Sequence, residues 1–126
     1  MNGVIVIFAV SDPTASARIY SEVFGFVVQV DAPNYVELRM TQGSSLGLYQ
    51  KEGFPRNFGG RIAPKAAGAA QPAELYVRVP DASAVIGALE AHGWALQSAL
   101  AERPWGERVA YFLDPDGFVV AVAEIP

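Results

Sequence analysis

Charged and aromatic side chains that could bind a small molecule recur on predicted strands in both halves of the chain. Tyr35, Glu37 and Arg39 alternate with apolar residues, and this period of two puts them together on the wetter face of a strand. Glu74 and Tyr76 alternate in the same way in the second half. Carboxylates, a guanidinium and phenol rings offer ion pairing and stacking. The pattern therefore predicts half-buried strands whose wetter faces carry side chains that could contact a small molecule.

The sequence contains no familiar catalytic arrangement. It has no cysteine and a single histidine, His92, which falls in the last turn of a predicted helix beside Gly93, where a helix-terminal role is expected. No serine stands in a Gly-x-Ser-x-Gly elbow, and no glycine-rich phosphate loop follows a predicted strand. A catalytic function would need Glu74 as a lone base beside Tyr76.

Composition excludes two classes of partner. The chain has 126 residues and a formal net charge of -4, so it offers no basic surface for nucleic acid or for an anionic membrane. Its most apolar stretch, Val4 to Val10, is too short to span a bilayer. Without cysteine there is no disulfide framework or thiolate zinc site. We expect one structural domain, located in the cytoplasm.

The same order of strand and helix signals occurs twice. Asp12 is expected to begin a helix that Gly25 ends, and Asp81 begins a second helix that Gly93 ends. The strand before the first helix is continuously apolar, which predicts burial on both of its faces. Strands are predicted at 3–10, 26–30, 35–40, 45–50, 74–81, 95–100, and on both sides of the turn Asp114-Pro115-Asp116-Gly117.

Each half therefore reads βαβββ. The first module covers residues 1–50 and the second covers residues 73–126. Between them, residues 51–72 are rich in Gly and Pro and are interpreted as a linker loop. The linker contains two aromatic residues, Phe54 and Phe58.

These features resemble the vicinal oxygen chelate superfamily, which includes glyoxalases, extradiol dioxygenases and bleomycin-resistance proteins. The resemblance rests on the two βαβββ halves, on Gly25-Phe26 and Gly93-Trp94 after the helices, and on the final Tyr-Phe-Leu-Asp-Pro-Asp-Gly. It implies an α+β fold in which two tandem modules form curved mixed sheets around a concave cavity, with the helices on the convex side. It also implies a homodimer.

The resemblance further implies four strand positions that hold a divalent metal ion in the enzymes of this superfamily. Here they fall on Ile5, Gly47, Glu74 and Ala121. Only Glu74 carries an oxygen ligand, whereas hard cations take six or more ligands. We therefore expect no metal and no cofactor.

The same register selects the residues of the concave face. The predicted ligand-binding residues are Tyr35, Glu37, Arg39, Tyr49, Glu74, Tyr76, Trp105, Arg108 and Phe112, with Phe54 and Phe58 as loop walls. Structural roles compete with this interpretation. Glu74 could pair with Arg108 or Arg39, Trp105 could be a core plug, and the linker phenylalanines could cover a dimer partner.

The favoured function is a metal-free binding protein of the bleomycin-resistance type. Such a protein would sequester an aromatic, cationic drug-like ligand in a cavity at a dimer interface. One alternative is a lyase or isomerase related to glyoxalase, with Glu74 as base or metal ligand. Another is an interaction protein whose cavity is filled by its own side chains.

Overall fold

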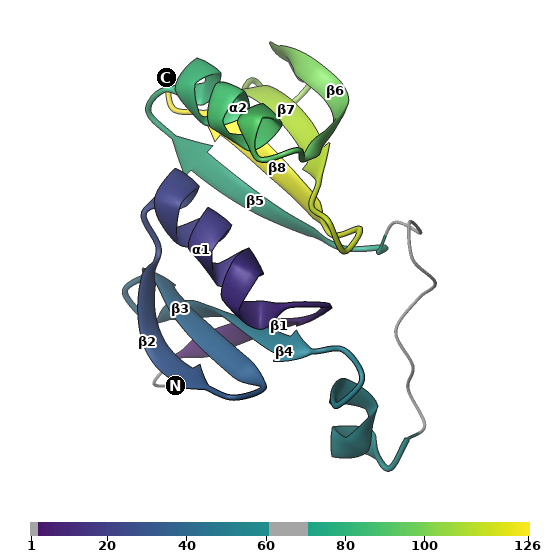
Figure 1. Cartoon of the computed structure of the whole chain (residues 1–126). Helices are drawn as coiled ribbons and strands as arrows, with labels where there is room; N and C mark the ends of the chain where they lie inside the picture. Colours follow the sequence, from purple (N-terminus) through teal and green to yellow (C-terminus); the bar gives the residue numbers. More distant parts are fainter. Residues whose placement is uncertain (1–2, 61–70) are drawn as a thin grey trace. The chain divides into compact units, whose positions relative to one another are not determined.

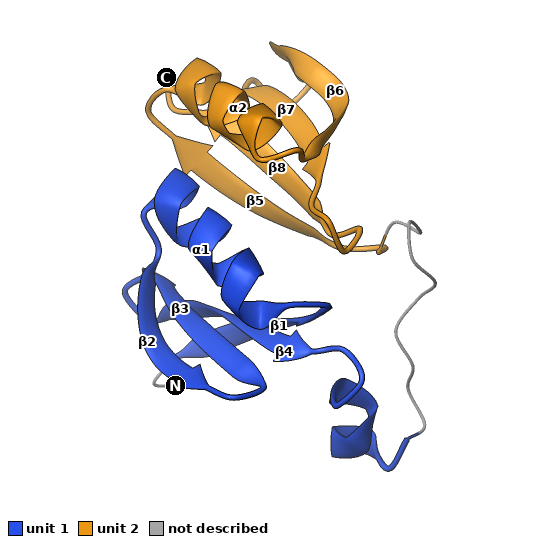
Figure 2. Ribbon diagram, in the orientation of Figure 1, with its two compact units in different colours: residues 1–64 blue, residues 65–126 orange. Residues whose placement is uncertain are grey.

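The fold consists of two similar compact units, each a single βαβββ module. The computed structural model describes residues 3–60 and 71–126 and divides into unit 1, residues 1–64, and unit 2, residues 65–126 (Figure 2). The α+β class and the repeat predicted from sequence are confirmed. Residues 61–70 of the predicted linker lie outside the described residues. Within the described ranges, no helix is long and apolar enough to cross a bilayer.

Unit 1 is a four-stranded mixed sheet covered by one helix (Figure 1). The strand order is β1-β4-β3-β2, with β1 parallel to β4 and the other pairs antiparallel. Its elements are β1 (Val4–Val10), α1 (Pro13–Phe24), β2 (Val27–Ala32), β3 (Tyr35–Thr41) and β4 (Ser44–Gln50). A short 3-10 helix, η1 (Phe54–Phe58), follows. The prediction that residues 51–72 form only a loop was therefore wrong for Phe54–Phe58.

Helix α1 begins and ends where the sequence predicts. The Asp12 Oδ1 atom accepts a hydrogen bond from the Ala15 N–H at 3.1 Å, which satisfies one of the free donors at the helix start. Gly25 ends the helix with φ 74°, a left-handed conformation that glycine adopts without strain. The helix packs on β2, β3 and β4. Tyr20 of α1 and Leu38, Leu46 and Leu48 of the sheet are fully buried there.

Strand β1 is not covered on both faces, contrary to the sequence-based expectation. It is an edge strand, and its four residues from Val4 to Ile7 are between 42% and 49% exposed. The reason is the position of α1, which covers the strands at the other side of the sheet. Within unit 1, four consecutive β-branched residues thus lie at a sheet edge, a feature that proteins usually protect.

Unit 2 repeats the architecture of unit 1. Its strand order is β5-β8-β7-β6, with β5 parallel to β8. Its elements are β5 (Glu74–Val79), α2 (Ala82–Ala91), β6 (Ala95–Glu102), β7 (Arg108–Leu113) and β8 (Val119–Glu124). The Asp81 side chain accepts from the Ala84 N–H at 3.1 Å at the start of α2, in the same way as Asp12 in α1.

The final hairpin forms as predicted around its Asp-Pro-Asp-Gly turn. The Asp114 Oδ1 atom accepts from the N–H groups of Asp116 at 3.0 Å and Phe118 at 2.9 Å. Gly117 has φ 83°. A buried carboxylate that satisfies backbone donors holds such a turn in one conformation, and this conformation sets the register between β7 and β8.

That register corrects two of the predicted site residues. Phe112 pairs with Val120 and Arg108 pairs with Glu124, so both lie on the face of the sheet that α2 covers. Phe112 is completely buried. Glu124 also accepts a hydrogen bond from the Ala82 N–H at the start of α2, at 3.3 Å. The predicted register of β7 was off by one residue, and such a slip moves every side chain of a strand to the other face. The prediction that Arg108 and Phe112 face the concave side was therefore wrong.

Candidate functional site

The open face of unit 1, the face turned away from α1, carries the polar residues that the sequence predicts. Cross-strand pairing puts Glu37 beside Gly47, Tyr35 beside Tyr49, and Arg39 beside Ser45. The parallel pairing of β1 with β4 adds Ile5, Ile7 and Ala9 to the same face. Tyr35, Glu37, Arg39 and Tyr49 therefore share one surface.

Glu37 is the centre of a hydrogen-bond network on this face. Its Oε1 atom accepts from the Tyr35 hydroxyl at 2.7 Å, and its Oε2 atom accepts from the Gln29 side-chain amide at 2.5 Å. The same amide donates to the Ser45 hydroxyl at 2.8 Å. Burial raises the pKa of Tyr35, and the hydrogen bond to Glu37 raises it further. The phenol therefore stays protonated and holds the carboxylate in place.

Gly47 lies directly under the Tyr35 side chain. A Cβ atom at this position would stand 2.6 Å from the Tyr35 hydroxyl oxygen and 2.8 Å from its Cε1 atom. Real Cβ atoms do not approach other atoms so closely. The space that a side chain at position 47 would need is thus occupied by the phenol ring.

A strip of aromatic rings runs from β3 to η1. The ring centroids of Tyr35 and Tyr49 are 5.7 Å apart, those of Tyr49 and Phe54 are 6.2 Å apart, and those of Phe54 and Phe58 are 5.1 Å apart. These are stacking and edge-to-face distances. The structure therefore brings Phe54 and Phe58 together with Tyr49; a role for them as ligand walls stays a prediction.

The open face of unit 2 is built around two alanines. Ala121 pairs with Tyr76 on one side and Tyr111 on the other. Both tyrosines pack against a buried cluster of Val109, Ala121 and Ala123. Sequence reasoning did not include Tyr111 in the site. Counting back from the turn glycine would have found it, because Tyr111 precedes Gly117 by as many residues as Glu37 precedes Gly43.

A second hydrogen-bond network, the Glu107 latch, joins the loop before β7 to strand β5. Glu107 accepts from the Tyr76 hydroxyl at 2.7 Å and from the Arg78 Nε atom at 2.8 Å. The Trp105 indole N–H donates to the Tyr76 hydroxyl at 3.0 Å. Trp105 is 55% exposed, so the core-plug interpretation was wrong. Glu107 was not predicted as a site residue.

The base of this loop is fixed by Arg103. Its guanidinium donates from Nη2 to the Val109 carbonyl at 2.7 Å, to the Ser98 hydroxyl at 3.0 Å and to the Ala99 carbonyl at 3.0 Å. It also lies over the Tyr111 ring at 5.1 Å from the centroid. Several charge-assisted hydrogen bonds from one side chain restrain the loop strongly.

Glu74 borders a hollow of about 410 Å³ in unit 2, together with Tyr111 and Val119. The alternative of a pair between Glu74 and Arg108 was wrong, because Arg108 forms its ion pair with Glu124 at 2.8 Å on the face under α2. Within the part of unit 2 that the structure describes, Glu74 has no ion pair. Its carboxylate is exposed at the edge of the hollow.

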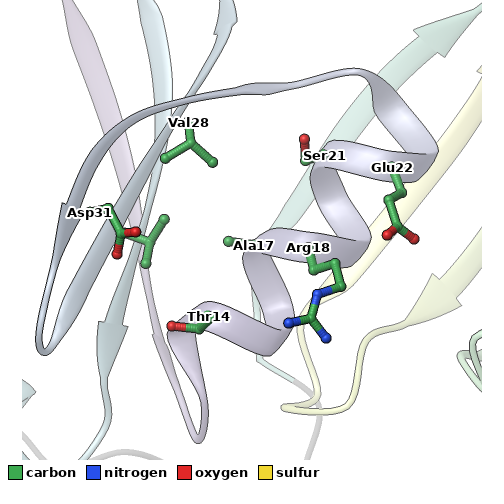
Figure 3. Close-up of a pocket in the computed structure, with 8 residues that line it drawn as sticks. Thr14, Ala17, Arg18, Ser21, Glu22, Val28 and Asp31 are labelled. Carbon is green, nitrogen blue, oxygen red and sulfur yellow. The ribbon is translucent and has the colours of Figure 1, made fainter.

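A further groove of about 320 Å³ lies on the opposite face of unit 1, between α1 and β2 (Figure 3). Ala17 and Ser21 of the helix are too short to fill the space above Val28. Arg18 and Glu22 line the same groove. It is separate from the predicted site, and sequence reasoning did not anticipate it.

The metal ion implied by the superfamily resemblance does not fit the residues present. Ile5 and Ala121 have no donor atom, and Gly47 leaves no room for one beneath Tyr35. Above Ala121 the space is taken by Tyr76 and Tyr111. Among residues 3–60 and 71–126, no three His, Cys, Asp or Glu side chains gather as a metal site would require. Glu74 alone cannot hold a hard cation.

Replacement of Gly47 by alanine tests the packing of Tyr35. We expect Gly47→Ala to lower the free energy of unfolding by about 1–3 kcal/mol, because overpacking forces the phenol ring to move. The double variant Gly47→Ala with Tyr35→Ala should be less destabilised than the sum of the two single changes. Urea unfolding measures both; strict additivity would show that the ring does not restrict position 47.

The Glu107 latch should depend on pH in one direction. Hydrogen bonds from Arg78 and then Tyr76 hold the pKa of Glu107 below its ordinary value. A lowered pKa means that the latch is complete at neutral pH and opens only as pH falls through that lowered value. With Trp94→Phe as background, Trp105 emission should stay constant down to the usual glutamate range and change below it.

Glu107→Gln should shift Trp105 emission already at neutral pH, whereas Glu90→Gln on the exposed side of α2 should not. An emission change centred above the usual pKa of glutamate would contradict the latch.

Comparison with known proteins agrees with this fold. The model of the Glyoxalase-like domain family matches residues 3–125. No curated protein sequence matches the chain. Among solved structures, a glyoxalase-related enzyme from Fulvimarina pelagi is 23% identical, with a TM-score of 0.82, and the match covers 97% of this chain and 86% of that one.

Two further solved structures show the same fold. A protein of unknown function from Agrobacterium tumefaciens is 25% identical, with a TM-score of 0.80, over 100% of this chain and 95% of the other. A glyoxalase/bleomycin resistance protein/dioxygenase family enzyme from Burkholderia phytofirmans is 22% identical, with a TM-score of 0.78, over 99% and 98%. With nearly every residue inside the family match, the chain belongs to the Glyoxalase-like domain family.

Proposed function

We propose that this protein binds a small molecule without a metal ion and sequesters an aromatic, cationic, drug-like ligand, as a bleomycin-resistance-type protein would. The observation that carries the proposal is the Trp105 indole, which is 55% exposed and yet is fixed by its hydrogen bond to Tyr76. A large exposed ring that is held in one orientation is a preorganised stacking surface.

Charge in unit 2 supports a cationic ligand. Arg78 is already neutralised by Glu107 at 2.8 Å, so it adds no net positive field near Trp105. Glu74 keeps a free carboxylate within the described part of unit 2. Tyr76 and Tyr111 fill the space over Ala121, which favours a flat ligand on the surface over one enclosed inside the sheet.

An enzymatic role is the second candidate, because two similar structures are described as enzymes. In this chain it would rest on Glu74 acting as a base or as a metal ligand. The donor positions argue against the metal route, since Ile5 and Ala121 offer no oxygen or nitrogen. A third role, in protein association alone, predicts that no small molecule binds.

A matched pair of ligands tests stacking and charge separately. N-methylphenanthridinium and neutral phenanthridine share the same flat ring system. We expect both to quench Trp105 in the Trp94→Phe background, with the cation binding at least tenfold more tightly. Trp105→Leu should weaken both by at least tenfold, as measured from the fluorescence anisotropy of the ligand. Glu74→Gln should remove only the preference for the cation.

Metal ions provide the control for the enzymatic alternative. Thermal shift with nickel, zinc, manganese and iron should leave the melting temperature unchanged, and elemental analysis of the purified protein should find no stoichiometric metal. A tightly bound metal would overturn the proposal. Absence of any response to both phenanthridines would favour the protein-association role.

We propose further that the protein is a homodimer. The support is the open edge of β1, where Val4, Ile5, Val6 and Ile7 are all exposed, because contiguous exposed aliphatic residues mark interaction surfaces. Sedimentation equilibrium should give twice the chain mass, and Val6→Lys should shift the equilibrium toward monomer without loss of secondary structure. A monomeric wild-type protein at micromolar concentration would refute this.

A further inference from the structure

A hollow of about 420 Å³ lies at one end of the open face of unit 1. Its lining combines two apolar residues, two neutral hydrogen-bonding residues and one charge of each sign. The residues on which the argument depends are Ile5, Gln29, Ser45, Glu37 and Arg39. All of these residues belong to unit 1, whereas Trp105, Tyr76 and Glu107 belong to unit 2.

The two charges in the hollow do not neutralise each other. The Glu37 carboxylate is turned toward Tyr35 and Gln29, which donate to its two oxygens at 2.7 and 2.5 Å. Both donors are neutral, so the negative charge is oriented but not compensated. Arg39 is exposed and forms no ion pair with the other described residues of unit 1, 3–60. The hollow therefore presents an anchored anion and an available cation.

We infer that this hollow binds a zwitterionic amino acid with an apolar side chain. The ammonium group would bind Glu37 and the carboxylate would bind Arg39, while the apolar side chain would lie on Ile5, which shares the open face with them. Glu37 and Arg39 stand two residues apart on one strand face, which separates their Cα atoms by roughly 7 Å. Two charge-assisted hydrogen bonds of about 2.8 Å each bridge from such a pair to an α-amino acid.

Ligands with a single charge fit the hollow less well. A lone cation would be attracted by Glu37 but repelled by Arg39, and a lone anion would meet the reverse. A neutral ligand would leave both charges without an ionic partner. The Ser45 hydroxyl accepts a hydrogen bond from Gln29, so the hydroxyl proton of Ser45 is available to donate. Because Ser45 is the cross-strand neighbour of Arg39, it provides a second donor for the carboxylate of the ligand.

This inference concerns unit 1 alone and stands whether or not Trp105 binds an aromatic cation. The two can fail separately, because Trp105 emission reports on the surroundings of the indole in unit 2, whereas backbone amide shifts of residues 29, 37, 39 and 45 report on the hollow.

Three probes that share a phenyl ring test the zwitterion. L-phenylalanine carries both charges, phenethylamine carries only the ammonium, and 3-phenylpropanoate carries only the carboxylate. In ¹⁵N-labelled full-length protein, millimolar L-phenylalanine should shift the amides of the hollow. Each single-charge probe should bind at least tenfold more weakly.

Two variants assign the charges. Glu37→Gln should reduce L-phenylalanine binding to the level of 3-phenylpropanoate, and Arg39→Gln should reduce it to the level of phenethylamine. Glu90→Gln, an exposed change on α2, should leave all three affinities unchanged. Because Arg39 is exposed, its variant folds even if Glu37→Gln disturbs the Tyr35 network. Equal affinity for the three probes, or no amide shift in the hollow, would overturn the inference.

Discussion

The parallel pairing of the first and last strand of each module is the constraint on which both candidate surfaces depend. By pairing with β1, strand β4 becomes central in unit 1, and β8 becomes central in unit 2 by pairing with β5. The register of a central strand with its two neighbours decides which side chains of those neighbours point to each face of the sheet. Gly47 and Ala121 occupy matching places on these strands, so the side chains that converge above them come from two different neighbours. The composition of those neighbours decides what each open face can bind.

Local signals in the sequence predicted the helices and turns well, and long-range register less well. Asp12, Asp81 and Gly25 act within a few residues of their own positions, so their roles could be inferred without knowing the fold. The facing of β7 could not be inferred from its pattern, because Val109 to Leu113 are all apolar or aromatic and show no alternation. Its register depends on the turn at Asp114. Glu107 binds Arg78, which lies 29 positions earlier in the chain, and Tyr76, which lies 31 positions earlier. Only the tertiary structure reveals such contacts.

The open faces of the two units share a pair formed by a tyrosine and a glutamate, but the net charge around the pair differs. In each unit a tyrosine hydroxyl donates to a glutamate at 2.7 Å. In unit 2 the second donor is the cationic Arg78, which cancels the charge of the carboxylate and leaves an exposed aromatic surface. In unit 1 the second donor is the neutral Gln29, and the charge of the carboxylate persists. One motif thus produces an apolar platform in one module and a charged hollow in the other.

The fit of Tyr35 over Gly47 also limits the order in which mutations could accumulate. A chelating side chain at position 47 would collide with the phenol ring, and removal of Tyr35 alone would release the Glu37 carboxylate from one of its two donors. Either change made first carries a stability cost, and only the combination opens room for a ligand atom. At position 121 two tyrosines occupy the space that a longer side chain would need, because Tyr76 and Tyr111 both pack against Ala121. A metal ligand at position 47 or at position 121 would therefore require a coordinated change in the tyrosines that pack there.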